Sequence, residues 1–172
     1  MAFFAPLLGN QPHTLLLGSM PSQISLRSRR YYANPQNAFW WIVSQIYGFS
    51  ESLNYSSRTV ALTNAGVAVW DVLGAAKRPG SLDRNIDRAS EKANDFAQLL
   101  ERIPSLRLIG FNGAAARQIF MRHCSDVLQG NRQLKWVQLP STSPAHAALS
   151  KPDKLDIWRS ALMSVTQQQH YA

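Results

Sequence analysis

The chain has 172 residues, of which 45% are apolar and 16% are charged, and it carries a formal net charge of +8. This balance excludes a disordered polymer, and the length predicts a single domain over residues 1–172. The single cysteine excludes an internal disulfide framework, a four-cysteine zinc site and a four-cysteine iron–sulfur cluster.

Four short apolar runs divide the chain, and most of them end at a glycine or a proline. These predicted strands cover residues 14–17, 67–70, 106–111 and 136–139. The segments between and after them predict helices over 37–47, 89–102, 114–123 and 153–168. Strands that alternate with helices are typical of βαβ units. We therefore predict a three-layer α/β/α fold around a central, mainly parallel sheet of four strands.

The first apolar run is followed by a segment that mixes hydroxyls, amides and aromatic rings. Gly18 and Pro21 turn the backbone just past the strand, and ligands of open α/β sheets bind at this end. The segment contains Ser19, Ser22, Tyr31, Tyr32, Asn34, Asn37, Phe39 and Trp40. The mixture suits a flat, hydrogen-bonding ligand such as a nucleobase, because rings stack on its faces and amides reach its edge.

Residues 74–88 form a polar insertion after the second predicted strand. Pro79 and Gly80 interrupt it, and it carries a dense set of charges that includes Arg78 and Asp83. The segment is too long for a plain turn, so we predict a functional loop or a surface arm.

The carboxyl ends of parallel strands lie along one edge of a sheet, so residues that are far apart in sequence should meet there. The residues that follow the four predicted strands are Ser19, Met20 and Pro21, then Asp71, then Asn112, then Ser141, Thr142 and Ser143. We predict that they converge on one cleft, provided that the sheet is parallel.

Common catalytic motifs do not account for this cleft. The sequence has no GxxxxGK[ST] phosphate loop, no GxGxxG after a strand and no HExxH helix, and its histidines lack metal-ligand spacing. We therefore expect neither a metal nor an organic cofactor. Ser19 lies in Gly-Ser-Met-Pro rather than in a GxSxG elbow, but an esterase that uses this serine stays open as a rival.

Four sequence blocks together resemble one known family. They are GSMPS at 18–22, YYANPQNAFW at 31–40, WDV at 70–72 and LPSTSP at 139–144. In this order, and near the predicted strand ends, they resemble the uracil-DNA glycosylase superfamily from about residue 12 to about residue 165. The branch that they resemble most is that of the hypoxanthine (deoxyinosine) DNA glycosylases. The resemblance implies hydrolysis of the N-glycosidic bond of a deaminated deoxynucleotide, which leaves an abasic site.

The resemblance also implies roles for single residues. Phe39 matches the ring on which the flipped base stacks, and Asn37 is the expected essential amide, which positions water or holds the leaving base. Other branches carry Asp or Asn where this chain has Met20, and several carry a base-contacting His where it has Leu139. The catalytic polar group must therefore lie elsewhere, which favours Asn37 and leaves Asp71 as the second candidate.

Structural roles stay open for the same side chains. Asn37 and Asn112 are also suited to helix capping, and Asp71 to capping a turn or pairing with a cation. The residues that we expect to bind the base are Ser19, Met20, Pro21, Tyr32, Phe39 and Asn112.

Positive charges and hydroxyls beside the cleft predict contacts with DNA phosphates. Before the aromatic block these residues are Ser22, Arg27, Arg29 and Arg30. The resemblance implies that the last block presses into the minor groove, where a short wedge holds the vacated space. Its candidates are Ser141, Thr142 and Ser143 for backbone contacts and His146 for the wedge or a phosphate.

These observations predict a cytoplasmic, monomeric glycosylase that removes deaminated bases from double-stranded DNA, hypoxanthine first and uracil second. The location follows because no apolar stretch is long enough to span a membrane and residues 1–10 lack the pattern of a secretory signal. Cys124 is expected to be a structural thiol. The alternative is a non-catalytic nucleic-acid-binding module on the same scaffold, which Met20 makes conceivable. Purine or pyrimidine preference stays open.

Overall fold

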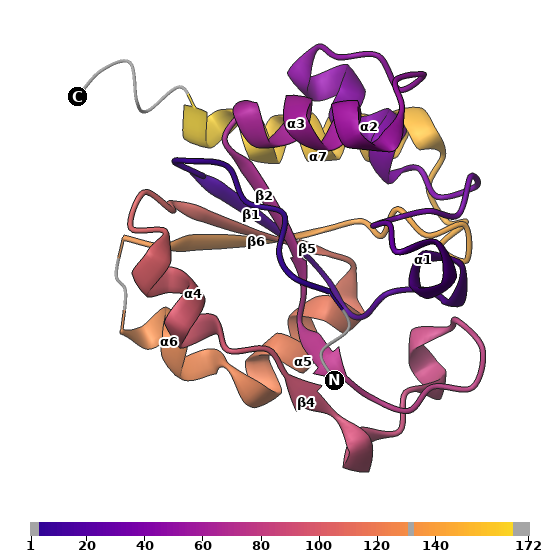
Figure 1. Ribbon diagram of the computed structural model, residues 1–172, viewed down its shortest axis with the longest axis vertical. Helices are drawn as coiled ribbons and strands as arrows, with labels where there is room; N and C mark the ends of the chain where they lie inside the picture. The colour runs from indigo at the N-terminus through magenta and orange to yellow at the C-terminus, as the bar shows by residue number, and fades with distance from the viewer. Residues whose placement is uncertain (1–3, 131–132, 167–172) are drawn as a thin grey trace.

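The computed structural model describes residues 4–130 and 133–166, and a four-stranded parallel sheet forms its centre (Figure 1). Every neighbouring pair of strands in this sheet is parallel, and the order is β2-β1-β5-β6. The predicted fold class and the four predicted strands are confirmed. The strands are β1 (Thr14–Gly18), β2 (Val67–Asp71), β5 (Leu108–Asn112) and β6 (Lys135–Leu139).

Helices cover both faces of the sheet and complete the three layers (Figure 1). A parallel pair of strands needs a crossover connection, and here these connections are largely helical. One face carries α2 (Phe39–Tyr47), α3 (Tyr55–Asn64) and α7 (Lys151–Thr166). The other face carries α4 (Phe96–Arg102), α5 (Ala114–His123) and α6 (Ser125–Gln129).

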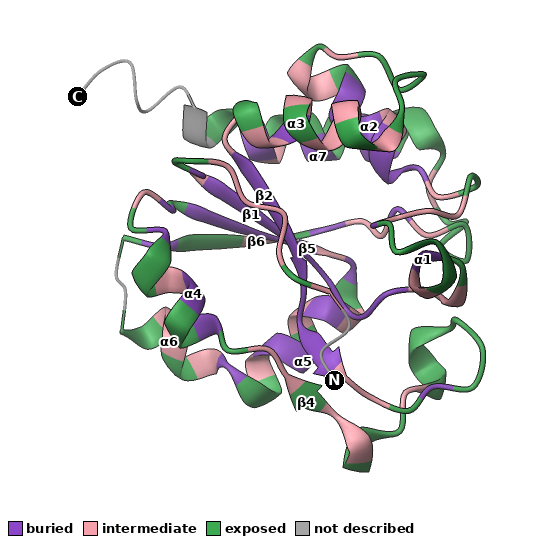
Figure 2. Cartoon of the chain, viewed as in Figure 1, coloured by how far each residue is buried: buried purple, intermediate pink, exposed green. Residues whose placement is uncertain are grey.

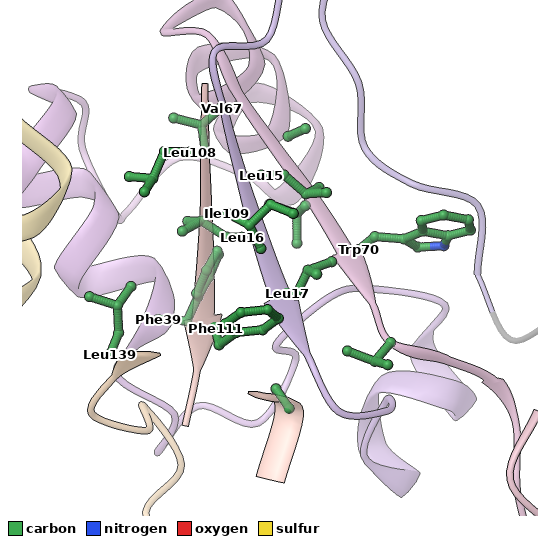
Figure 3. Packing of buried hydrophobic residues seen from close by; sticks show 14 of the residues in the cluster. Leu15, Leu16, Leu17, Phe39, Val67, Trp70, Leu108, Ile109, Phe111 and Leu139 are labelled. Carbon is green, nitrogen blue, oxygen red and sulfur yellow. The ribbon is translucent and has the colours of Figure 1, made fainter. Parts of the chain in front are cut away.

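The central strand β1 is enclosed from both faces. Leu15, Leu16 and Leu17 are 0% exposed, which fits the continuous apolar run typical of a central parallel strand. Figure 3 shows them beside Ile109 and Phe111 of β5. Figure 2 shows buried residues along β1, β2 and β5, with exposed ones on the outer helix faces and along most of the edge strand β6. Burying each leucine stabilises the folded state by about 1.5–3 kcal/mol. The core therefore holds β1 in place and determines where the chain leaves this strand.

The helix predicted over residues 89–102 is wrong in its first half. The side chain of Asp95 accepts a hydrogen bond from the Gln98 backbone N–H at 2.9 Å, so Asp95 caps α4 and the helix begins at Phe96. The residues before it pair in a small antiparallel sheet that closes the insertion at its base. Its elements are β3 (Leu73–Ala75), η1 (Asp83–Asn85), η2 (Arg88–Ser90) and β4 (Lys92–Ala93).

Three helices of the described residues were not predicted: the short α6, and α1 (Gln23–Ser28) and α3, in whose sequences polar residues dominate and whose starts are defined by side-chain caps. In α1, Ser22 Oγ accepts from the Ser25 N–H at 3.1 Å. In α3, Asn54 Oδ1 accepts from the Ser57 N–H at 2.9 Å. The predicted end of the last helix, at 167–168, lies outside the described residues.

Three segments gather beyond the carboxyl ends of the strands. They are α1 with the loop that follows it, the insertion between β3 and β4, and the loop after β6, all at the right of Figure 1. Because these loops come from distant parts of the sequence, they enclose space that no single element could form. None of the helices in the described ranges has both the length and the apolar character needed to cross a bilayer.

Candidate active site

A cavity of about 280 Å³ opens at the carboxyl ends of the strands. Residues at or just after all four strand ends line it, so the predicted convergence is confirmed. The parallel register explains this, since Gly18 lies opposite Asp71 and Asn112 opposite Leu139. Of the predicted site residues, the wall contains Ser19, Met20, Pro21, Ser22, Tyr32, Asn37, Asp71, Asn112, Ser141, Thr142 and Ser143.

Asp71 is a buried carboxyl at the wall of this cavity, 5% exposed at the end of β2. Burial, with a smaller contribution from the charge of Asp83, raises its pKa to about 7 against the opposing effect of Arg78. Its Oδ2 atom has no hydrogen-bond partner among the described residues. Arg78 pairs with Asp83 instead, at 3.3 Å, so Asp71 holds a proton readily near neutral pH.

Gly18 makes the room in which the Asp71 carboxyl lies. A Cβ added at Gly18 would be 2.5 Å from Asp71 Oδ1 and 3.1 Å from Tyr32 Oη. The end of β1 therefore approaches both polar groups more closely than any side chain would allow. These three residues form one continuous part of the cavity wall.

Tyr32 presents an aromatic ring to the cavity. Its φ of 51° is in the left-handed region, which is uncommon for a residue other than glycine. The ring stacks on Phe39, with centroids 3.8 Å apart and planes inclined by 15°. Phe39 itself is 0% exposed and does not line the cavity, which corrects the expectation that this ring meets the base.

The Tyr32 hydroxyl is buried and, like Asp71 Oδ2, makes no hydrogen bond of ordinary geometry within the described residues, although the nearby Asn112 side chain interacts with it and lowers its pKa. Burial raises the pKa of this phenol far above its usual value, and the charge of Asp71 adds to the effect. The hydroxyl therefore keeps its proton and can both donate and accept a hydrogen bond.

Asn37 combines a structural contact with a place in the cavity wall. Its Oδ1 accepts a hydrogen bond from the Phe39 N–H at 3.0 Å, at the start of α2. Within the described residues its Nδ2 has no partner, so these two N–H groups are available to a ligand. Asn37 therefore caps the helix with Oδ1, while Nδ2 stays available for catalysis.

Asn112 ties the loop after β6 to the sheet. Its Nδ2 donates to Thr142 Oγ1 at 2.8 Å, and its Oδ1 accepts from the Thr142 N–H at 2.9 Å. The Thr142 carbonyl in turn accepts from the Ala38 N–H at 3.0 Å. Thr142 is 1% exposed, so this side chain holds the loop together, and the expectation that it grips a phosphate is corrected.

The insertion folds into the site, which agrees with the functional-loop alternative predicted for residues 74–88. Asp83 Oδ1 accepts from Ser19 Oγ at 2.7 Å and from Arg78 at 3.3 Å, and Arg78 also donates to the Pro21 carbonyl. The side chain of Arg78 is 2% exposed. The only sequence signal for Arg78 and Asp83 was the charged, Gly/Pro-interrupted character of residues 74–88.

A second cavity, of about 350 Å³, adjoins the first and shares Tyr31, Tyr32, Asn34 and Asn37 with it. Three cations line it, each over an aromatic ring. The pairs are Arg30 over Tyr55 at 5.7 Å, Arg58 over Trp40 at 4.9 Å and Lys151 over Trp41 at 5.8 Å.

The remaining predicted contact residues lie outside both cavities. Arg27, Arg29 and His146 are exposed and line neither of them. Arg29 ends α1 in a left-handed conformation, with φ 53°. These residues are accessible to a large partner but do not touch a ligand in the cavity.

Cys124 is a buried free thiol, as expected of a structural cysteine. Burial raises its pKa to about 11, so the thiol stays neutral. In the part of the chain that the structure describes, no three His, Cys, Asp or Glu side chains gather in a way that could hold a metal ion.

Comparisons with known proteins agree with this architecture. Residues 6–162 match the model of the uracil DNA glycosylase superfamily. A protein of Methanosarcina acetivorans named hypoxanthine DNA glycosylase is 37% identical over 149 residues, which cover 86% of this chain and 89% of that protein. One of Methanosarcina barkeri with the same name is 38% identical over 111 residues, 64% of this chain and 69% of that protein.

A solved structure also has the same fold. It is the solution NMR structure of a protein from Methanosarcina acetivorans described as a candidate uracil DNA glycosylase. The TM-score is 0.74 at 34% sequence identity, and the match covers 91% of this chain and 95% of that one. The chain belongs to the uracil DNA glycosylase superfamily.

Proposed function

We propose that the protein is a DNA glycosylase that hydrolyses the N-glycosidic bond of deaminated bases, hypoxanthine first and uracil second, and leaves an abasic site. The names of the two Methanosarcina relatives support the reaction and the first substrate. The observation that carries the proposal is the cavity at the strand ends, whose wall combines a ring, amides and a buried carboxyl.

The reaction makes three demands on the site. The base must leave the stack, which costs a few kcal/mol and less when the base is mispaired. The departing base must be stabilised, and each oriented donor in a water-poor cleft contributes roughly 3 kcal/mol. Water must then reach the cationic sugar carbon. Asn37 and Asp71 are the polar groups that we assign to catalysis, and Tyr32 supplies the ring against which the base lies.

The decisive experiment uses labelled duplexes that carry hypoxanthine, uracil, xanthine or mismatched thymine. After incubation with the protein, alkali cleaves abasic sites, so strand scission reports excision. Cleavage of the deoxyinosine duplex supports the enzyme. Binding without scission on every duplex would favour the non-catalytic nucleic-acid-binding module, and inactivation by a serine-directed phosphonate would revive an esterase that uses Ser19.

DNA is the partner that the family implies, and the net charge of +8 fits it. We propose that the protein acts as a cytoplasmic monomer on the double-stranded form. We assign Arg30, Arg58 and Lys151 of the second cavity to phosphates of the lesion strand, because that cavity shares a wall with the base-sized one. Arg27, Arg29 and His146 add contacts outside it.

Removing the charges of the second cavity is expected to weaken binding to lesion DNA. For the double variant Arg58→Gln and Lys151→Gln we expect Kd to rise about 10-fold and the slope of log K against log salt to fall by about 1 per lost phosphate contact. Fluorescence anisotropy over a salt series measures both. Arg102→Gln, an exposed charge at the end of α4 on the other side of the sheet, is the control. Equal effects in the two proteins would contradict the assignment.

A methyl group at Gly18 is expected to impair the site. In Gly18→Ala the new Cβ collides with the Asp71 carboxyl, so the free energy of unfolding should fall by about 1–3 kcal/mol and deoxyinosine cleavage by at least about tenfold. Urea denaturation and single-turnover cleavage measure these changes. Gly130→Ala is the control, because its Cβ would meet only an ordinary contact at 3.6 Å. Wild-type rates in Gly18→Ala would show that the position of Asp71 is unimportant.

A further inference from the structure

Two polar atoms beside Gly18 are buried without a hydrogen-bond partner in the described residues: Asp71 Oδ2 and Tyr32 Oη. Unpaired buried polar groups cost free energy and are rare in folded proteins. Both residues line the same cavity, and both approach the position that a Gly18 Cβ would take. Groups left unpaired in this way are suited to a ligand that supplies the missing partners.

We propose that Asp71 is the acid that gives a proton to a ring nitrogen of a purine lesion, and that this step makes the pocket selective for purines over pyrimidines. The inference rests on the proposed glycosylase function and adds to it the substrate class and the proton donor.

Burial raises the pKa of Asp71 to about 7, so a large share of this carboxyl holds its proton near neutral pH, and the groups that face it adjust this share. Tyr31 and Tyr32 face it from the loop after α1, and their buried phenols stay neutral. Asp83 and Arg78 face it from the insertion. The charge of Asp83 favours the proton on Asp71, and Arg78 opposes it but is engaged with Asp83 and the Pro21 carbonyl. The carboxyl therefore donates a hydrogen bond near neutral pH.

A proton donor at this place matters for purines. The imidazole ring of a purine carries a basic nitrogen, N7, and the six-membered ring carries N3, so a protonated purine departs as a neutral molecule. Uracil has no basic ring nitrogen and departs as an anion, for which hydrogen-bond donors such as the Asn37 amide suffice. A positioned general acid typically contributes 10²–10⁴-fold in rate.

The step balances in protons and electrons. The Asp71 proton moves to the purine nitrogen, the bond between C1′ and N9 breaks, and its electron pair stays with the base, which leaves neutral. Water forms the new C1′–O bond and releases one proton to solvent. Asp71 regains its proton from solvent, so the enzyme returns to its starting state. Tyr32 Oη lies, like Asp71 Oδ1, close to Gly18, and we assign it to holding the base in position.

The test compares Asp71→Asn with the wild type in single-turnover cleavage of deoxyinosine duplexes from pH 5 to pH 9. The wild-type rate should fall as pH rises through about 7, where Asp71 loses its proton. In Asp71→Asn we expect a rate at least about 100-fold lower at pH 6, with no such fall. A thermal melt of the variant checks that it is folded.

Two analogues identify the nitrogen. If N7 accepts the proton, wild type should cleave 7-deaza-deoxyinosine about as slowly as Asp71→Asn cleaves deoxyinosine, and 3-deaza-deoxyinosine at the normal rate. The reverse pattern would assign N3. Asp83→Asn serves as a matched carboxylate variant: it should keep the pH-dependent limb but move it to lower pH, because the charge that favours the proton on Asp71 is gone.

The outcomes separate this inference from the proposed function. If wild type cleaves deoxyinosine duplexes but Asp71→Asn keeps the same rate and pH profile, or if both deaza analogues are cleaved at the normal rate, the acid role of Asp71 is overturned and the glycosylase stands. If wild type releases no base from any lesion duplex, the proposed function itself fails.

Discussion

Asn37→Ala is expected to lower deoxyinosine cleavage by about 100-fold or more while the protein still binds lesion DNA. The Asn37 amide lines the cavity, and its Nδ2 has no partner within the described residues, so its N–H groups are available to the leaving base or to water. Losing one oriented donor from an enclosed site typically costs roughly 3 kcal/mol of transition-state stabilisation. Binding depends on many phosphate contacts and should change little.

The measurement separates chemistry from helix capping. Asn37 Oδ1 also accepts from the Phe39 N–H, so the alanine variant loses about 1 kcal/mol of stability as well. Asn54→Ala removes a comparable cap from α3, away from the cavity, and should lose stability without losing activity. Asn37→Asp keeps the accepting oxygen but not the N–H groups, and we expect it to be as inactive as Asn37→Ala. Wild-type cleavage by Asn37→Ala on both deoxyinosine and deoxyuridine duplexes would refute the assignment.

Asp71→Asn is expected to make the fold more stable at alkaline pH, even though it impairs catalysis. The pKa of Asp71 is about 7 in the folded protein and 3.8 as the ordinary value. At a pH between these two pKa values, Asp71 is protonated in the folded state and ionised in the unfolded chain. The free energy of unfolding of the wild type therefore falls as pH rises from about 4 to about 7. The variant escapes this loss and should gain about 2–4 kcal/mol in the free energy of unfolding at pH 8.

Urea denaturation at pH 5 and pH 8 measures this effect. The stability difference between Asp71→Asn and wild type should be larger at pH 8, because at pH 5 much of the wild-type penalty has not yet developed. Asp156→Asn is the control: its side chain is 78% exposed on α7, and its removal should leave the pH dependence unchanged. An equal difference at both pH values would mean that Asp71 titrates normally.

The results expected for Asp71→Asn imply that the site lowers the stability of the folded protein. A buried carboxyl without a partner destabilises the native state, and such groups persist where they serve a reaction. The left-handed backbone at Tyr32 is a second such feature of the same cavity. Activity and stability are therefore expected to change in opposite directions at Asp71, which a purely structural residue would not do.

Much of the fold was predictable because buried parallel strands have a plain signature. Runs such as residues 14–17 are continuously apolar and end sharply, since both faces of the sheet are covered. The helices were less predictable. Residues 89–102 have an apolar pattern that suits a helix, but Asp95 caps α4 late and the preceding residues pair with β3. Helix α3 has few apolar residues, and its start depends on the Asn54 cap.

The sequence by itself determined the four strands, the edge at which they end and the types of residue that follow them. Only the tertiary structure decided the state of those residues: that Tyr32 covers Phe39, that Asp71 Oδ2 has no hydrogen-bond partner within the described residues, and that Asp83 reaches Ser19 across 64 positions of the chain. The physical reason is that strand formation depends on local apolar patterning, whereas burial and electrostatic environment depend on which distant segments fold against each other.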